Sequence, residues 1–197
     1  MNDVGFINSM RRMNRLGLAA AIAALIATPL VAQSFSDGYT FLKAVRERDG
    51  NVAERILSNP SSTAVNARDP STGETALHIL VRGRDLSWLS YMLSKGARPD
   101  AQSNDGTTPL ILSAQLGWLE GATQLLARRA NPNLGNRSGE TPLIVAVQRR
   151  DIQMVRLLLS QRANPNQTDN LAGNSAIDYA RQDPRAAAIL RELEQHH

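Results

Sequence analysis

Apolar residues in this chain occur in pairs of short groups with helical spacing. One group spans residues 110–114 and is made mainly of small and aliphatic side chains, and a second begins just after Gly117. The second group consists of Leu119, Ala122, Leu125 and Leu126. These positions follow an i, i+3, i+6, i+7 spacing, which brings them onto one face of a helix. The pattern therefore predicts two short helices, each apolar on one side, joined by a tight turn at the glycine.

This pair of groups returns at a constant interval. The stretch that opens each copy is Gly73-Glu74-Thr75-Ala76-Leu77, Gly106-Thr107-Thr108-Pro109-Leu110, Gly139-Glu140-Thr141-Pro142-Leu143 and, in a weaker form, Gly173-Asn174-Ser175-Ala176-Ile177. The first three copies start 33 residues apart, and the fourth starts 34 residues after the third. A fixed interval of this length is typical of stacked helical units. The sequence thus predicts an all-α repeat solenoid of helix-turn-helix pairs.

The predicted repeat domain covers residues 38–194, after a linker at 33–37 and before a tail at 195–197. It contains about five units. Their boundaries are expected near 38–66, 67–100, 101–133, 134–166 and 167–194. The first and last units depart most from the pattern, as terminal units without a second neighbour commonly do. In the first unit, the apolar helix face consists of Phe41, Leu42, Ala44 and Val45.

The residues at the predicted helix starts are of the kinds that cap helices. Thr108 can accept a hydrogen bond from the first turn, and Pro109 then stands where its missing N–H is not needed. Asp49, Asp85 and Asp151 share one phase of the repeat, just before the second helix. A carboxylate there caps the helix and faces its positive end. We interpret these acids as stabilising rather than catalytic.

The recurring stretch resembles the ankyrin repeat, whose pattern is roughly G-x-T-P-L-H-x-A, then a glycine, a V-x-x-L-L pair and G-A-x-x-N. Matching residues are Thr75, Leu77, His78, Leu93, Gly96 and Ala97; Thr108, Pro109, Leu110, Gly117, Leu125 and Leu126; and Thr141, Pro142, Leu143, Ala146, Leu158, Leu159, Ala163 and Asn166. Ile111 and Ile144 replace the family's histidine, and Arg129 and Arg162 replace its late glycine. The resemblance implies that His78 is structural and bonds the backbone of neighbouring turns.

The same resemblance implies a protein-binding surface on the concave side of the stack, made of the turn tips and the exposed positions of each first helix. Transferred by repeat phase, the candidate partner-binding residues are Arg46, Arg82, Asn104, Asp105, Thr107, Gln115, Trp118, Arg137, Ser138, Glu140, Gln148 and Arg149. Trp118 occupies the phase where other copies have aspartate. We expect it to be partly exposed, and either to cover the next repeat or to contact a partner.

The first 32 residues have the layout of a targeting segment. Arg11, Arg12 and Arg15 precede an uncharged apolar run at 16–27, and small residues follow up to Ala32. This order is typical of a secretory signal peptide, and the run is short for a membrane span, which needs about 20 residues. We predict cleavage near Ala32 and export to the periplasm of a bacterial cell. The alternatives are an uncleaved inner-membrane anchor with the repeats facing the periplasm, twin-arginine export, or a buried helix of the domain.

Charge and composition narrow the function classes. The leader holds three arginines and one aspartate, so the chain's net charge of +4 falls to +2 over residues 33–197. Such a balanced chain gives no electrostatic case for nucleic acid. The absence of cysteine excludes disulfides, thiolate metal sites and a cysteine nucleophile. His196 and His197 stand together without a third metal ligand nearby, and no phosphate-binding or catalytic motif occurs.

The sequence therefore predicts no catalytic residue, no cofactor and no metal. The favoured function is a non-catalytic protein–protein interaction module of the bacterial cell envelope, acting as a monomer on a partner protein of unknown identity. One alternative is a membrane-anchored accessory factor supporting an envelope or oxidative-stress enzyme, with membrane contact only through the leader. Another is an enzyme, which would need a convergent pocket of titratable side chains on the concave face.

Overall fold

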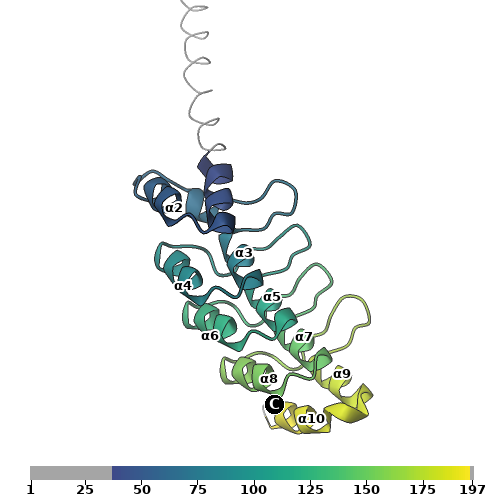
Figure 1. Ribbon diagram of the computed structural model, residues 1–197. Coiled ribbons are helices and arrows are strands. Elements are labelled where there is room, and N and C mark those ends of the chain that lie inside the picture. The colour runs from purple at the N-terminus through teal and green to yellow at the C-terminus, as the bar shows by residue number, and fades with distance from the viewer. Residues whose placement is uncertain (1–36, 196–197) are drawn as a thin grey trace, which may run out of the picture.

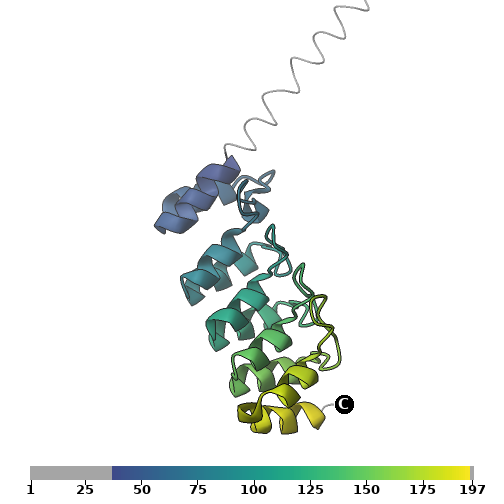
Figure 2. The same ribbon diagram turned by 90° about the vertical axis from the view of Figure 1, so that its right-hand side faces the viewer.

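The computed structural model describes residues 37–195, and within them the chain folds into five stacked pairs of helices (Figure 1). The all-α repeat solenoid predicted from the sequence is confirmed. Each pair consists of an inner helix followed by an outer helix. Before the inner helix of each pair from the second to the fifth, the chain makes an extended turn, which we call a finger. We number each finger after the pair that follows it, and all fingers project to the same side (Figure 1). Figure 2 shows the pairs as successive layers of one stack.

The helices differ little in length from pair to pair. The inner helices are the helix at 37–47, α3 (Ala76–Arg82), α5 (Pro109–Leu116), α7 (Pro142–Gln148) and α9 (Ala176–Gln182). The outer helices are α2 (Gly50–Leu57), α4 (Leu86–Ser94), α6 (Leu119–Ala127), α8 (Ile152–Ser160) and α10 (Ala187–Glu194). Two 3-10 turns, η1 (Ala64–Asn66) and η2 (Pro184–Ala186), lie after α2 and before α10. Pro184 therefore opens a 3-10 turn, and the last outer helix begins directly after it, at Ala187.

The helices begin at the residues that the sequence predicted as caps. The Thr108 and Thr141 hydroxyls accept hydrogen bonds from backbone N–H groups three residues ahead, at 3.1 and 3.2 Å. The carboxylates of Asp49, Asp85 and Asp151 do the same at the starts of α2, α4 and α8, at 3.0, 3.1 and 3.0 Å. Each such cap stabilises its helix by about 1 kcal/mol. Local chemistry thus sets where these five helices start.

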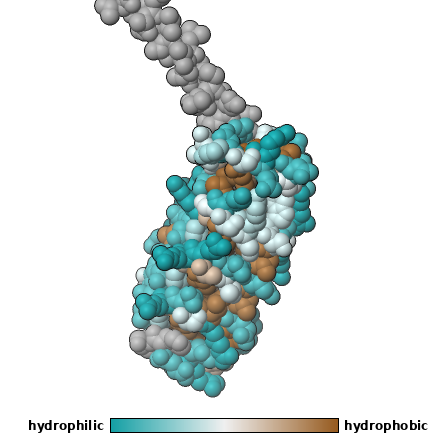
Figure 3. All heavy atoms as spheres, turned by 90° about the vertical axis from the view of Figure 1, so that its left-hand side faces the viewer, coloured by the Kyte–Doolittle hydropathy of each residue, from teal (hydrophilic) through white to brown (hydrophobic). Residues whose placement is uncertain are grey.

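The stack is held by apolar packing within and between pairs. Inner helices α3, α5, α7 and α9 contact one another in order, and so do outer helices α4, α6, α8 and α10. The inner helices α5 and α7 are buried almost all round, because an outer helix and two neighbouring pairs surround them. The outer helices bury one side only. Their outward side is polar with scattered apolar groups (Figure 3).

Adjacent fingers are tied by backbone hydrogen bonds. The N–H groups of Asn104, Arg137 and Asn170 donate to the carbonyls of Thr72, Asp105 and Ser138 at 2.8, 3.0 and 2.8 Å. Gly106 has a φ of +83°, and a Cβ placed on it would lie 2.6 Å from the Arg137 nitrogen. The close approach of the next finger therefore requires glycine at the residue that opens the repeated stretch.

A second row of bonds links the repeats where the outer helices end. Side-chain oxygens of Asn66, Asp100 and Asn133 accept hydrogen bonds from the backbone N–H groups of Arg98, Asn131 and Asn164, at 2.8, 2.8 and 2.7 Å. Each acceptor belongs to the turn that precedes a finger, and each donor lies in the following repeat. The Asn and Asp residues of these polar turns thus connect one repeat to the next.

Several arginines adopt the left-handed backbone conformation that favours glycine. Arg48, Arg84 and Arg150 do so between an inner and an outer helix, with φ of 57°, 50° and 57°. Their side chains reach the next repeat, where they contact Asp85 Oδ2 at 2.9 Å, the Leu116 carbonyl at 2.5 Å and Asp183 Oδ2 at 3.0 Å. Arg129 and Arg162 do so after the outer helices, both with φ of 64°. Gly96 occupies the equivalent position of the second unit, with φ of 89°.

The predicted leader, residues 1–32, lies outside the described residues, as do most of the predicted linker and His196 and His197. Residue 37, which the sequence placed in the linker, is already helical. Among residues 37–195, no helix combines the length and apolar character that a membrane crossing requires.

Candidate interaction surface

The inner helices and the fingers together form one face of the stack, which we call the concave face. A hollow of about 390 Å³ opens on this face between the second and third fingers. Five of the predicted partner-binding residues line it, namely Arg82, Asn104, Asp105, Thr107 and Gln115. The structure thus brings together residues that are up to 33 positions apart in the sequence, as the repeat phase predicted.

Arginines in the first half of this face already have partners. Arg82 pairs with Glu74 across the base of the second finger. Arg46 Nη2 lies 2.5 Å from Asp69 Oδ2. Hydrogen bonds from Ser71, together with Arg46, hold the pKa of the Asp69 carboxyl far below its usual range. These arginines therefore have to exchange an existing contact before they can bind a partner.

Three predicted residues of the third finger serve the finger itself. The Asn104 amide donates to the Ser71 carbonyl at 2.8 Å. Asp105 accepts hydrogen bonds from the Ser103 hydroxyl at 2.5 Å and from the N–H and hydroxyl of Thr107, and these bonds lower the pKa of its carboxyl. Thr107 is buried, with 7% of its surface exposed, so little of it is left for a partner. Its hydroxyl donates to Asp105 within the finger.

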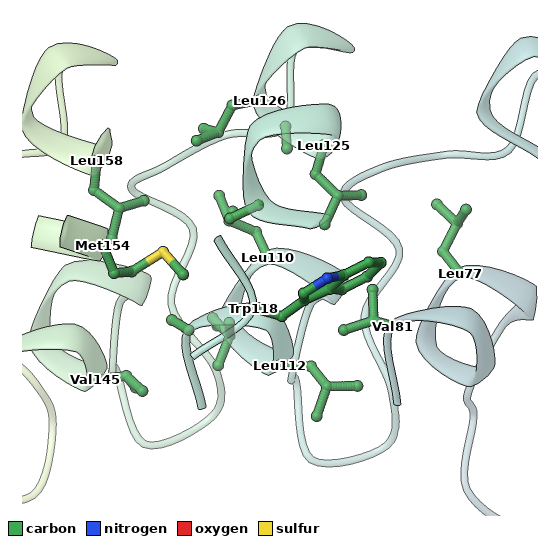
Figure 4. Packing of buried hydrophobic residues seen from close by; sticks show 14 of the residues in the cluster. Leu77, Val81, Leu110, Leu112, Trp118, Leu125, Leu126, Val145, Met154 and Leu158 are labelled. Carbon is green, nitrogen blue, oxygen red and sulfur yellow. The ribbon is translucent and has the colours of Figure 1, made fainter. Parts of the chain in front are cut away.

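Trp118 is also buried, with 5% of its surface exposed, and the expectation of a partly exposed aromatic is wrong. Figure 4 shows its indole among buried aliphatic side chains of the stack. The indole fills the space that a side chain at position 121 would otherwise occupy, since a Cβ on Gly121 would lie 2.0 Å from the indole ring. The equivalent positions of the other repeats carry Trp88 and Met154 beside a capping aspartate. Trp118 therefore replaces both the cap and the large side chain, and it acts in packing.

The fourth finger and helix α7 carry the remaining predicted residues. Glu140 accepts a hydrogen bond from the Asn136 amide at 2.9 Å, and the Ser138 carbonyl accepts the Asn170 N–H. Gln148 is exposed and lies against the Tyr179 hydroxyl. Arg137 and Arg149 are exposed, and among the described residues neither guanidinium forms a hydrogen bond or ion pair. These two arginines are the predicted residues most available to a partner.

Sequence reasoning missed two features near the fifth finger. Tyr179 donates a hydrogen bond to the buried Asp169 carboxylate at 2.5 Å, which raises the pKa of the tyrosine and lowers that of the aspartate. Leu171 stands at the tip of this finger with 78% of its surface exposed. The extra residue in this repeat, which makes its interval 34 and not 33, was the available signal that the finger differs.

The buried imidazole of His78 serves the structure. His78 Nδ1 accepts the Thr75 N–H at 3.1 Å, and its Nε2 donates to the Thr107 carbonyl at 2.9 Å, which confirms the structural role expected of it. Burial lowers the pKa of this histidine. Within residues 37–195, no group of three or more histidine, aspartate or glutamate side chains is arranged to hold a metal ion.

This geometry defines a helical solenoid with a polar face built from regularly spaced fingers. The family model described as ankyrin repeats (3 copies) matches residues 41–136, 86–169 and 119–195. The chain belongs to the ankyrin repeat family. Ankyrin repeats generally mediate protein–protein interaction, and proteins built from them are typically non-catalytic.

Among curated proteins, the chain is similar to oxysterol-binding protein homolog 1 of Saccharomyces cerevisiae. The two are 34% identical over 86 residues, which make up 42% of this chain and 7% of the yeast protein. The similarity therefore concerns a small part of that relative's length.

Proposed function

We propose that this protein is a non-catalytic binding module that docks a partner protein on its concave face. The observation that carries the proposal is the pair of exposed arginines, Arg137 and Arg149, which stand before and after α7 without partners among the described residues. Guanidinium groups bind carboxylates in a bidentate manner. The partner surface is therefore polar and presents acidic side chains. Leu171 adds an apolar contact at the next finger.

The face suits rigid docking. Neighbouring repeats hold each finger by backbone hydrogen bonds, so little ordering cost accompanies binding. A standard interface buries about 1,600 Å² in total, which three or four such repeats can supply.

The test compares proteins crosslinked in the native host to the wild type and to an Arg137→Ala/Arg149→Ala variant. Arg191→Ala is the control, because this exposed arginine lies on the outer helix α10 and also forms no ion pair with another residue of the range 37–195. We expect a partner that the wild type and the control capture and that the double variant loses. Equal capture by all three proteins would refute a concave-face site.

We further propose that the module works outside the cytoplasm, in the bacterial periplasm, after removal of residues 1–32. The arginines and the apolar run of the leader support this proposal. Mass measurement of the protein isolated from cells distinguishes the possibilities. A mass matching residues 33–197 supports a cleaved, exported module. A full-length mass in the membrane fraction instead favours the anchored accessory factor of an envelope or oxidative-stress enzyme.

A further inference from the structure

Cations gather without carboxylate partners where the outer helices end. We define this basic edge as residues 94–100, 127–133 and 160–166, which contain the ends of α4, α6 and α8. Its cations are Lys95, Arg98, Arg128, Arg129 and Arg162, all of them exposed. None of these side chains forms an ion pair within the described part of the chain. The edge contains one acid, Asp100, so it carries a net positive charge.

Two of these cations stand in an unfavourable backbone conformation. Arg129 and Arg162 have φ of 64°, where a residue with a Cβ is strained and glycine is not. Attraction to the negative helix end does not explain Arg129. Lys95 and Arg128 already place a cation at the ends of α4 and α6 with ordinary φ values of −84° and −100°. The charge at Arg129 therefore points to a role outside the fold, and Arg162 repeats this charge one unit later, after the uncharged Gln161 at the end of α8.

The arrangement of the edge indicates what it can bind. Helices α4, α6 and α8 pack side by side, and packed helices lie about 8–10 Å apart. Each repeat contributes one or two cations, so the cations form a line in which neighbouring repeats are about 8–10 Å apart. An extended peptide advances about 3.3 Å per residue, so every third residue meets the next repeat. The large hydrophobic side chains exposed among residues 37–195 all lie outside this edge, so it offers no apolar group to insert into a membrane.

We propose that the basic edge binds an extended acidic segment of a protein partner, with a carboxylate at about every third residue. Each carboxylate meets the guanidinium or ammonium group of one repeat. This second surface is distinct from the concave face, since its residues follow the outer helices and precede the fingers. It goes beyond the proposed function and does not depend on it.

The experiment uses the full-length chain and two fluorescein-labelled 12-residue peptides, followed by fluorescence anisotropy at low salt. One peptide repeats Glu-Gly-Ser four times, and the other has the same composition with its four glutamates adjacent. We expect the spaced peptide to bind at least threefold more tightly than the clustered one, and added salt to weaken it. Arg129→Gln/Arg162→Gln should weaken binding at least fivefold, because glutamine keeps the backbone unchanged and removes the charge. Asp100→Asn should tighten it.

The control is Arg55→Gln/Arg191→Gln, which removes two exposed charges from α2 and α10 that form no ion pair within the part of the chain that the structure describes. This variant should bind the spaced peptide within twofold of the wild type. An equal loss in both double variants would show an effect of net charge alone and overturn the proposal. So would equal binding of the two peptides, or binding to phosphatidylglycerol vesicles without binding to either peptide. The concave-face variant Arg137→Ala/Arg149→Ala should bind the spaced peptide almost normally, which separates this test from that of the proposed function.

Discussion

Replacement of Arg129 by glycine should stabilise the protein. This arginine has φ of 64° directly after α6, at the position where the second unit has Gly96. Its side chain is exposed and forms no ion pair among the described residues. The substitution therefore relieves backbone strain and removes no contact that the fold uses.

The magnitude follows from two opposing terms. A left-handed backbone costs a residue with a Cβ about 1–2 kcal/mol. Glycine loses more conformational entropy on folding, which costs about 0.5–1 kcal/mol. The net gain is about 0.5–1 kcal/mol at Arg129 and the same at Arg162. The two sites are 33 residues apart, so the gains should add to about 1–2 kcal/mol in the double variant.

Urea unfolding followed by circular dichroism measures the change. The Arg129→Gly/Arg162→Gly variant should unfold at higher urea concentration than the wild type, with an unchanged slope. Arg128→Gly is the matched control. Its φ of −100° suits any residue, so glycine should destabilise the protein there by about 0.5–1 kcal/mol. A lower midpoint for the double variant, or equal effects of Arg128→Gly and Arg129→Gly, would refute the reasoning from backbone strain.

Three further predictions concern the core. Leu126→Ala should cost about 2–5 kcal/mol in urea unfolding because it opens a cavity in the stack, and a neutral result would contradict the packing seen here. Stability should fall as pH drops below about 6.5, because the unfolded chain protonates His78 more readily than the folded chain does. The His78→Gln variant should lose less stability than the wild type as the pH drops below that value. Trp118→Asp should cost about 3–5 kcal/mol, and Gly121→Met should also destabilise the protein. The double variant restores the pattern of the neighbouring repeats, so it should be at least 1 kcal/mol more stable than the sum of the two single losses predicts. Additive losses in thermal or urea unfolding would show that the two positions do not share one space.

The repeat architecture could be predicted because its causes are local. The apolar spacing fixes each helix face, and residues such as Thr108 and Asp151 fix helix starts through bonds that span three positions. Comparison of whole units in register, and not of Trp118 alone, would have shown that the large side chain had moved to the cap position and that glycine stood in its former place. That comparison sets Asp85 and Trp88 against Trp118 and Gly121.

Contacts between repeats could not be predicted in the same way. Arg48 meets Asp85, which is 37 positions away, and this contact forms only when the two repeats stack. The engagement of Arg46 and Arg82 by carboxylates likewise depends on how the fingers fold over the inner helices. Repeat phase therefore predicted which residues share one face, whereas the subset of side chains left available to a partner required the structure.

The backbone bonds between fingers connect only immediate neighbours, as between the Arg137 nitrogen and the Asp105 oxygen. A duplicate of residues 101–133 inserted after Asn133 would present the same donor to the unit on one side and the same acceptor to the unit on the other. The gene can therefore lengthen or shorten this array by whole units without redesigning any junction. Such changes would alter the length of the docking face in increments of one repeat. Natural variants of different length should retain the same hydrogen bonds between neighbouring fingers.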